Sequence, residues 1–422
     1  MPAYQQKFVS PRVIRGNRGD LLSRWGILSA VATMTQRPVD VFCSRQRHLP
    51  PIPATSIPYG PVYNLFPPLS GWRSLAKADV VIWTGGLDLQ DDSSLAKLCH
   101  TWLVFFIYRL LGLKIVCVCQ GAGPLGSPIG RFLARAVLSQ TVVFMARDKG
   151  TFDLVSSLRS RAKLVRSHDG IFLPGFEPVA HPTSKVFADL EKTSEEHRGP
   201  LIAINMRLWF HFTGGFLPYQ FAKASFRERA DERMSAFVDA FVRLIGRLRT
   251  EMDARVVLVS MYEPGIEEWE DDAMWLGQLK ASFADDPAVL LCEDDLSIPE
   301  FITLMKKFDL VIGTRLHSTL TALRQGVRAI HLSYTNKGKD IFDSLGLAEF
   351  AFDLNGFIEA PDQVFELART TIDKKDLPGR IAGITANAIV ENLQALDQAL
   401  AEACTGERGS GGQRSPSNSR LS

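Results

Sequence analysis

Short apolar runs alternate with longer amphipathic segments along almost the whole chain. In the first half the runs are only four or five residues long, which is typical of buried strands: Val39–Phe42, Val80–Trp83, Ile115–Cys119 and Val142–Met145. Between them, apolar residues recur at helical spacing over Leu21–Met34, Ser94–Leu111 and Ile129–Leu138. This alternation predicts an α/β fold in which helices cover both faces of a parallel sheet.

The same alternation restarts in the second half of the chain. Its apolar runs predict strands at Leu201–Met206, Val256–Ser260, Val289–Cys292, Asp309–Ile312 and Arg328–Ser333. Helical patterns cover Met234–Thr250 and Leu316–Arg324, and Ser297 with Glu300 has the capping-box spacing that opens a helix. Two such halves in series predict two Rossmann-like domains facing a cleft, with ligands beyond the carboxyl ends of the strands.

Two proline-rich stretches interrupt the pattern. Prolines are dense from Pro50 to Pro68, which predicts a loop. Between Pro174 and Pro200 prolines and charges replace the apolar periodicity, so we place the domain boundary there. The last residues are mostly Gly, Ser, Arg and Asn, a composition typical of disorder. The predicted organisation is an N-terminal domain at 8–178, a C-terminal domain at 198–360, helices packing back on the core at 361–403 and a disordered tail at 404–422.

Composition limits the partners and the compartment. The 422 residues exceed what one hydrophobic core holds, and the formal charge of +2 gives no reason to expect nucleic acid as a partner. The six cysteines are scattered, and the spacing of Cys117 and Cys119 fits neither a zinc site nor a redox pair. We therefore expect reduced cysteines, no metal and a cytoplasmic protein.

Two segments bear on membrane attachment. Residues 1–6 are polar and lack the apolar core of a signal peptide. The apolar run 102–119 is interrupted by Arg109, Gly112 and Lys114, which favours a helix, a turn and a strand over a transmembrane helix. Peripheral association with the inner face of the membrane stays open, although no residue requires it.

The strongest chemical signal is the stretch 311–319, where a buried strand turns at Gly313-Thr314 into a helix. This geometry directs Arg315, His317 and the unpaired N–H groups of the helix start toward one place, which suits a phosphate or carboxylate. Arg315 offers a planar fork to an anion, and His317 can move a proton near neutral pH. The alternative is structural: Arg315 holds a carboxylate of the protein, and His317 is a hydrogen-bonded core residue.

Further cations follow neighbouring strands. Arg207 follows the strand at 201–206, and Lys337 follows the strand at 328–333, in a loop that also contains the uncharged Tyr334. Together with Arg315 and a helix start, these cations would balance about three negative charges, although a sugar nucleotide diphosphate, with about two, would also fit.

Glycine-bearing loops follow strands in the first half and predict one rim of a cleft. They contain Asn17-Arg18-Gly19-Asp20, Gly85-Gly86 and Gln120-Gly121. Asp20 is interpreted as the N-cap of the helix that follows. In the second half, the aromatic segment 208–229 either stacks on sugar rings or fills space between the domains. The acidic segment 263–272 is interpreted as a solvated rim.

These motifs together resemble those of polysaccharide pyruvyl transferases of the colanic-acid and cell-wall-polymer type. The matching pieces span roughly 16–350: Asn17-Arg18-Gly19-Asp20, Gly85-Gly86, Gln120-Gly121-Ala122-Gly123-Pro124, Arg147-Asp148, Asn205-Met206-Arg207, Gly313-Thr314-Arg315-Leu316-His317-Ser318, and Tyr334 with Lys337. The resemblance implies a GT-B-like fold, phosphoenolpyruvate as donor and a sugar of a glycan or lipid-linked intermediate as acceptor. It implies that the donor contacts Arg207, Arg315, Leu316 and His317.

The implied chemistry needs an acid, a base and anion contacts. Protonation of the donor's methylene carbon would let a sugar hydroxyl attack, and His317 is our candidate for the acid. The base is left open among Asp20, Asp88 and Glu263. The remaining predicted substrate contacts are Asn17, Asp20, Gly85, Gly86, Gln120, Gly121, Tyr334 and Lys337. The alternatives are a sugar-nucleotide glycosyltransferase of the same architecture and a non-catalytic glycan-binding subunit of a polymer-assembly complex.

Overall fold

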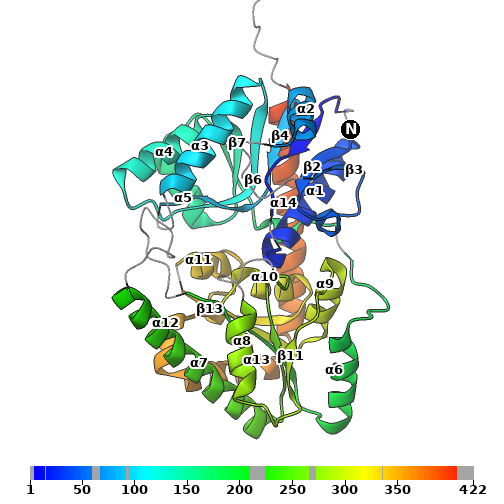
Figure 1. Ribbon diagram of the computed structural model, residues 1–422, viewed down its shortest axis with the longest axis vertical. Helices are drawn as coiled ribbons and strands as arrows, with labels where there is room; N and C mark the ends of the chain where they lie inside the picture. Colours follow the sequence, from blue (N-terminus) through cyan, green and yellow to red (C-terminus); the bar gives the residue numbers. More distant parts are fainter. Residues whose placement is uncertain are drawn as a thin grey trace, which may run out of the picture.

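Two parallel β-sheets, one in each half of the chain, organise the computed structural model of the protein (Figure 1). The structure describes residues 4–14, 16–58, 67–91, 95–175, 177–209, 224–265, 272–334 and 336–405. Each sheet with its covering helices forms a lobe, and the lobes stack along the long axis of the molecule, with the N-terminal lobe as the upper lobe and the C-terminal lobe as the lower lobe in Figure 1. All the described strand pairs within the sheets are parallel, as the alternation of apolar runs and helices predicts.

The N-terminal sheet has the strand order β3-β2-β1-β4-β6-β7-β8, and β5 pairs with β6 outside this path. Its strands are β1 (Phe8–Ser10), β2 (Val39–Cys43), β3 (Ala54–Pro58), β4 (Val80–Trp83), β5 (Gly86–Leu89), β6 (Lys114–Ala122), β7 (Thr141–Ala146) and β8 (Lys163–Arg166). The helices of this lobe are α1 (Arg18–Thr35), α2 (Leu69–Lys77), α3 (Leu95–Leu110), α4 (Pro128–Leu138) and α5 (Lys149–Ser157), with short 3-10 helices η1 (Gln46–His48) and η2 (Gly170–Phe172).

The C-terminal sheet has the order β11-β10-β9-β12-β13-β14. Its strands are β9 (Leu201–Asn205), β10 (Arg255–Val259), β11 (Val289–Cys292), β12 (Leu310–Gly313), β13 (Arg328–Ser333) and β14 (Ala351–Asp353). The helices are α6 (Lys185–Glu196), α7 (Ala224–Met252), α8 (Asp272–Ala281), α9 (Ile298–Lys307), α10 (Leu316–Arg324), α11 (Asn336–Ser344), α12 (Leu354–Glu359), α13 (Pro361–Asp373) and α14 (Leu377–Thr405), with the 3-10 helix η4 (Ala348–Phe350).

The strand order places the loops that carry chemistry. In each sheet the order reverses beside the first strand, between β1 and β4 in one lobe and between β9 and β12 in the other. Loops at such a reversal diverge to opposite faces of the sheet and leave a crevice at the carboxyl ends of the strands. The loops after β9 and β12 contain Arg207 and Arg315, and the loop after β1 contains Asn17.

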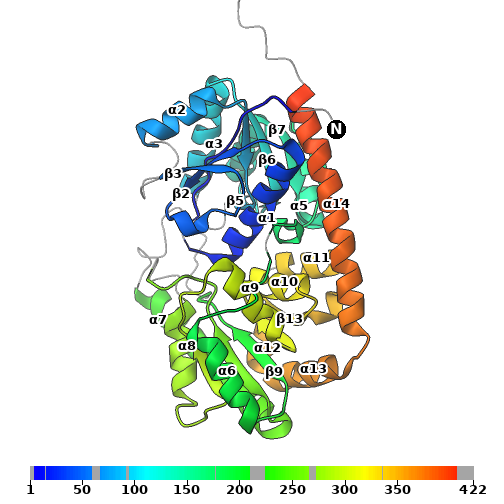
Figure 2. The ribbon, with the colours of Figure 1, turned by 90° about the vertical axis from the view of Figure 1, so that its right-hand side faces the viewer.

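The lobes share an apolar core close to these loops. Leu21 and Trp25 of α1 and Phe172 of η2 belong to the same buried cluster as Phe301 and Leu320 of the lower lobe. The long C-terminal helix α14 joins both lobes as well. Its first half packs in that shared cluster, and its second half packs on the upper sheet. Figure 2 shows α14 running along the upper lobe and past the junction beside the lower lobe.

Most predicted elements agree with the structure, and four differ. The strands at 80–83, 289–292 and 328–333, the helix at 316–324 and the Ser297 capping box are confirmed. The predicted loop at 50–68 contains the strand β3, which the prolines permit because β3 is an edge strand paired only with β2. The glycine-bearing loop predicted at Gly85-Gly86 leads into the strand β5, which begins at Gly86, and the predicted domain boundary at 174–200 contains α6. Helix α7 begins at Ala224, ten residues before the predicted start.

Two predictions fall outside the described residues. The disordered tail at 404–422 lies outside them from 406 onward, and most of the aromatic segment 208–229 does too. Leu208 and Trp209 of that segment are described.

Candidate functional site

The starts of two helices meet where the lobes face each other. Helix α1 begins at the loop after β1, and α10 begins directly after β12. A Cβ atom built on Gly19 in α1 would collide with the imidazole of His317 in α10. The two helix starts can therefore lie this close only because position 19 has no side chain.

His317 connects the lobes through a buried carboxylate. Its Nε2 lies 3.3 Å from Oδ2 of Asp169, a residue of the upper lobe just before η2, and its Nδ1 lies 3.9 Å from Oδ1 of Asp20. Arg147 donates to the same Asp169 oxygen at 3.0 Å, and the Ile171 N–H donates to the other at 3.1 Å. The chain thus places one histidine, one arginine and two carboxylates at the junction.

The charges around Asp169 keep it ionised. Burial alone would raise the pKa of this carboxyl, but the charge and hydrogen bond of His317, the charge of Arg147 and the Ile171 N–H outweigh it and hold the pKa well below its usual range. An ionised carboxylate only accepts hydrogen bonds, so Nε2 of His317 carries the proton in this contact. The fixed tautomer leaves Nδ1, on the side of Asp20, as the nitrogen that can exchange a proton.

Arg315 is buried against a carboxylate of its own lobe. Its Nε lies 2.8 and 2.9 Å from the two carboxylate oxygens of Asp272, and its Nη2 donates to Oδ1 at 2.6 Å. The guanidinium also lies over the ring of Tyr262, 4.5 Å from its centroid. In its described contacts Arg315 therefore has the structural role given as the alternative in the sequence analysis, because it holds a carboxylate of the protein.

The acidic segment 263–272 is not the solvated rim that its charge suggested. Asp272 is fully buried, and Glu263 is buried against His48, whose Nε2 lies 2.8 Å from Oε2. Arg47 lies 3.1 Å from the same oxygen. The interpretation failed because both carboxylates face arginine or histidine partners from distant parts of the chain. Residues 266–271 lie outside the described residues.

Arg207 lies in an aromatic setting. Its Nη1 donates to the hydroxyl of Tyr334 at 2.7 Å, and its guanidinium lies 5.0 Å from the Tyr334 ring centroid and 5.7 Å from that of Trp209. The rings of Trp209 and Tyr334 are 4.1 Å apart. Arg207 follows β9 and Arg315 follows β12, which are paired neighbours, but their described hydrogen bonds lead to different partners.

The other predicted lower-lobe contacts are near the same edge. Lys337 is in the first turn of α11, directly after the loop that contains Tyr334. Leu316 is the first residue of α10, and its partly buried side chain packs against the core shared by the lobes. Both positions are therefore close in sequence to the helix starts that face the upper lobe.

The first-half residues have mainly structural contacts. Asn17, not Asp20, is the N-cap of α1, because its side chain accepts from the N–H groups of Gly19 and Asp20. Asp20 lies in the first turn and is half-exposed. The Gln120 amide donates to the carbonyl oxygens of Trp83 and Thr84 inside the sheet.

Three glycines give room to their neighbours. A Cβ on Gly86 would meet the Arg12 guanidinium, and one on Gly121 would lie 3.0 Å from the Arg147 guanidinium. A Cβ on Gly85 would lie 2.7 Å from Oγ of Ser23. Gly121 therefore contributes to the position of an arginine that belongs to the His317 cluster.

Two of the three candidate bases are held in buried contacts. Asp88 lies 3.2 Å from Nε of Arg12 and accepts from Nε1 of Trp83. Burial opposes ionisation of Asp88, but Arg12 and Lys97 outweigh it and lower its pKa to about 2. The pKa of Glu263 is lowered too, because the hydrogen bond and charge of His48 and the charge of Arg47 outweigh burial. Asp20 is the candidate that lies beside His317.

Sequence reasoning missed Asp169 as a site residue and did not assign a role to Arg147. Both follow the carboxyl ends of strands, Arg147 after β7 and Asp169 three residues after β8. Their position after strands, where ligands bind in such sheets, is the sequence signal that could have identified them. Their meeting with His317 depends on how the lobes dock, which no local pattern contains.

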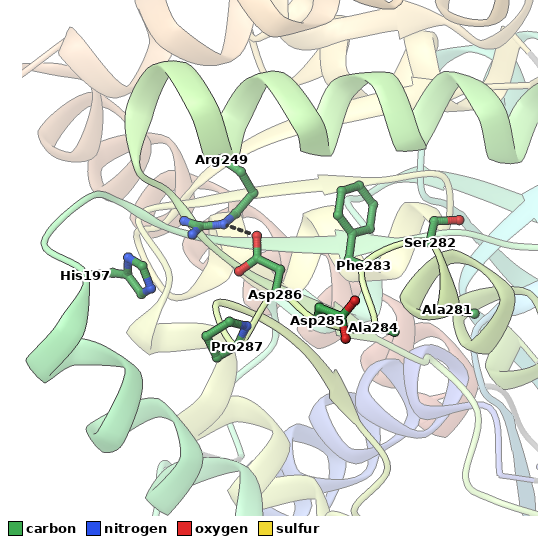
Figure 3. Close-up of a pocket in the computed structure, with 9 residues that line it drawn as sticks. All are labelled: His197, Arg249, Ala281, Ser282, Phe283, Ala284, Asp285, Asp286 and Pro287. Atoms are coloured by element: carbon green, nitrogen blue, oxygen red, sulfur yellow. Dashed lines mark hydrogen bonds and ion pairs between the residues drawn. The ribbon is translucent and has the colours of Figure 1, made fainter.

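A hollow at the far end of the lower lobe is unsuited to this chemistry. It is lined by His197, Arg249 and residues 281–287, and Figure 3 shows the Arg249–Asp286 ion pair across it. Pro287 precedes β11, so the hollow lies at the amino ends of the strands. Ligands in such sheets bind at the opposite edge.

Comparison with known proteins gives a family and a fold. A family model described as polysaccharide pyruvyl transferase matches residues 17–336. A putative UDP-N-acetylglucosamine 2-epimerase from Listeria monocytogenes is similar with a TM-score of 0.59 and 12% identity, over 95% of this chain and 98% of that one. Anabaena HepE in complex with UDP-glucose gives 0.56 and 13%, over 94% and 100%. A glycosyltransferase from Rickettsia africae gives 0.55 and 10%, over 96% and 100%. At these identities the likeness shows the fold, which is GT-B-like.

Proposed function

The chain belongs to the polysaccharide pyruvyl transferase family, and we propose that it takes pyruvate from phosphoenolpyruvate and attaches it as a cyclic ketal to a sugar of a polysaccharide or lipid-linked glycan precursor. It is an enzyme of a family that transfers pyruvyl groups to polysaccharide. The donor, the ketal and the lipid-linked form of the acceptor are the proposed parts. Other than these substrates, the proposed reaction needs no cofactor.

The observation that carries the proposal is the contact of His317 with Asp169 across the lobes. Protonation of the donor's methylene carbon forms a C–H bond and leaves positive charge on the central carbon. One sugar hydroxyl attacks that carbon and gives its proton to a base. A second hydroxyl then displaces phosphate and closes the ring, and its proton leaves with the phosphate. His317 is the acid, because Asp169 fixes its tautomer and leaves Nδ1 for proton exchange.

Asp20 is the proposed base. It is half-exposed, it lies 3.9 Å from Nδ1 of His317, and it can pass the hydroxyl proton back to the imidazole. This return would restore His317 for the next turnover. The two other candidates, Asp88 and Glu263, are already engaged by arginine and histidine partners.

The donor's phosphate and carboxylate require cations. Arg207, Lys337 and the N–H groups at the start of α10 are the proposed contacts, all from the carboxyl edge of the lower sheet. The proposed role of Arg315 differs from that of these contacts, because Asp272 already accepts hydrogen bonds from its Nε and Nη2. It fixes the start of α10, and therefore His317 two residues later, and we propose that it contacts the donor from this fixed position.

The test combines binding and product analysis. Isothermal titration of the full chain with phosphoenolpyruvate, and separately with UDP and GDP, should give binding of phosphoenolpyruvate alone. Incubation with phosphoenolpyruvate and a panel of galactosides, mannosides and glucuronides should give one product whose mass rises by pyruvate minus water, with release of phosphate. Binding of a nucleotide without phosphoenolpyruvate would refute the proposal in favour of glycosyl transfer.

Two histidine variants make the test specific to the site. His317→Asn should abolish phosphate release. His197→Asn is the matched control, because His197 also contacts a carboxylate, Asp253, at 2.8 Å, but at the far end of the lower lobe. Equal activity of both variants would remove His317 from the mechanism.

A further inference from the structure

The outer face of α3 and α4 is apolar although it faces solvent. The exposed side chains on α3 include Leu103, Phe106 and Leu110, spaced by three and four residues so that they form one stripe. On α4, Ile129 and Phe132 are exposed in the same way. Leu110 and Phe132 are 71% and 70% exposed, which is unusual for side chains of this size.

The two stripes form one surface, which we call the α3–α4 face. The helices contact each other, and the Gln140 side chain after α4 donates to the Trp102 carbonyl of α3 at 3.4 Å. The inner sides of both helices, through Phe105 and Val137, belong to one core cluster on one face of the upper sheet. Their opposite sides therefore point outward together, as Figure 1 shows at the left of the upper lobe.

The charged side chains on these two helices are all cationic, and the Asp91 carboxylate at the start of α4 is engaged by the N–H groups of Gly126 and Ser127. The chain has no Asp or Glu from residue 93 to residue 147, a segment that contains both helices. The exposed Arg109, Arg131 and Arg135 lie on these helices. The ion pairs among the described residues include none for these three arginines, whose described side-chain hydrogen bonds go to the Leu113 carbonyl and the Ser157 hydroxyl.

We propose that the α3–α4 face docks on an anionic lipid bilayer, with Phe132 and Leu110 entering the interfacial region and the arginines contacting lipid phosphates. Exposed Phe and Leu side chains on helices whose charged residues are cationic have the composition of interfacial membrane-binding surfaces. No helix in the described part of the chain is long and apolar enough to span a bilayer. The contact is therefore peripheral, and it goes beyond the proposed reaction because it does not involve the donor site.

A second copy of the chain fits this face less well. A twofold dimer places the same surface against itself, so the arginines of one copy would face those of the other without any carboxylate on either helix. Lipid phosphates provide the missing negative charge. An anionic bilayer therefore satisfies both the apolar and the cationic parts of the face.

The experiment measures partition of the full chain onto sedimented vesicles. Vesicles of equal parts phosphatidylcholine and phosphatidylglycerol should bind the protein, and vesicles of phosphatidylcholine alone should bind it at least tenfold more weakly. The double variant L110E/F132E should lose at least tenfold in partition onto the anionic vesicles. Its matched control is M274E/V390E, which adds the same charge at side chains of α8 and α14 that are 53% and 52% exposed and should bind as the unmodified chain does.

A second pair of variants tests the cations. R131Q/R135Q should lower partition about twenty-fivefold, because each arginine near an anionic surface contributes roughly a factor of five. The control K192Q/K306Q removes two exposed charges on the lower lobe and should have no such effect.

Three results would overturn the proposal: equal binding to neutral and anionic vesicles, unchanged binding of L110E/F132E, or a dimer in light scattering that L110E/F132E dissociates while vesicles bind nothing. Calorimetric binding of phosphoenolpyruvate should be unchanged in all these variants. A failure of membrane docking is thereby separated from a failure of the proposed reaction, and retained donor binding shows that the variants fold.

Discussion

The most informative single substitution is Asp169→Asn. Asp169 is fully buried and ties His317 of one lobe to Arg147 of its own. Removing one member of a buried charged group costs about 3–5 kcal/mol of stability, because the remaining charges lose their partner. Asparagine can still accept a hydrogen bond from the Ile171 N–H, so we expect a stability loss at the lower end of this range, about 3 kcal/mol.

The same substitution should slow turnover about a hundredfold or more. Without the carboxylate, Nε2 of His317 has no fixed acceptor and the productive tautomer is no longer selected. Phosphate release, followed against pH, is the assay. A positioning role predicts a changed pH profile of kcat with little change in KM for phosphoenolpyruvate, whereas a purely structural role would leave the shape of the profile unchanged.

The pKa direction fixes the pH dependence of stability. Since the folded pKa of Asp169 lies below its unfolded value of about 3.9, its stabilisation is fully present above that value and is lost as pH falls through the folded pKa. The difference in unfolding free energy between the unmodified chain and Asp169→Asn should therefore be constant near neutral pH. It should shrink below about pH 4.

The chain offers an exposed counterpart as a control. Asp253 also contacts a histidine and an arginine, at 2.8 Å to Nδ1 of His197 and 3.4 Å to Nη1 of Arg249, but it is exposed to solvent. Asp253→Asn should change neither turnover nor melting noticeably, since solvent screens such pairs. If Asp169→Asn changed turnover and melting as little as Asp253→Asn, the reasoning about the buried group would be refuted.

Two further substitutions probe the helix starts. Arg315→Lys should lower stability by about 1.5–3 kcal/mol, because lysine cannot make both contacts to Asp272, and should remove most activity; a variant with normal melting and turnover would contradict both roles. Gly19→Ala should lower turnover at least tenfold, because the new Cβ displaces His317. Its control is Gly246→Ala in α7, where the new Cβ would meet open space. This variant should gain about 1 kcal/mol of unfolding free energy, because alanine favours a helix over glycine. Equal phosphate release by the two variants would exclude the proposed crowding of His317.

The elements could be predicted wherever the signal is local. Strand β4 and helix α10 were predicted to the residue, because burial on one or both faces leaves a period in the sequence. Strand β3 was missed because prolines usually indicate a loop. They are also compatible with an edge strand, but the pairing of β3 with β2 alone is visible only in the structure. The start of α7 was missed because its first turns lack a strong apolar period.

The partners of the charged residues could not be predicted from the sequence. Arg315 was identified as chemically significant, but nothing in the acidic segment distinguishes Asp272, 43 residues earlier in the chain, as the carboxylate that turns inward. His317 and Asp169 are 148 residues apart and meet only through docking of the lobes. Local patterns identify charged loops; the three-dimensional pairing decides which charges remain for a ligand.

Helix α14 has a mechanical consequence. Ile381 near its beginning is buried in the cluster below the crevice, and Leu396 and Leu400 near its end are buried under the upper sheet. One continuous helix is thus buried at one end in the shared core and at the other end against the upper sheet. The lobes therefore cannot move far apart unless α14 bends or leaves one of these two sites. Each half of the protein therefore relies on this helix to complete its buried core.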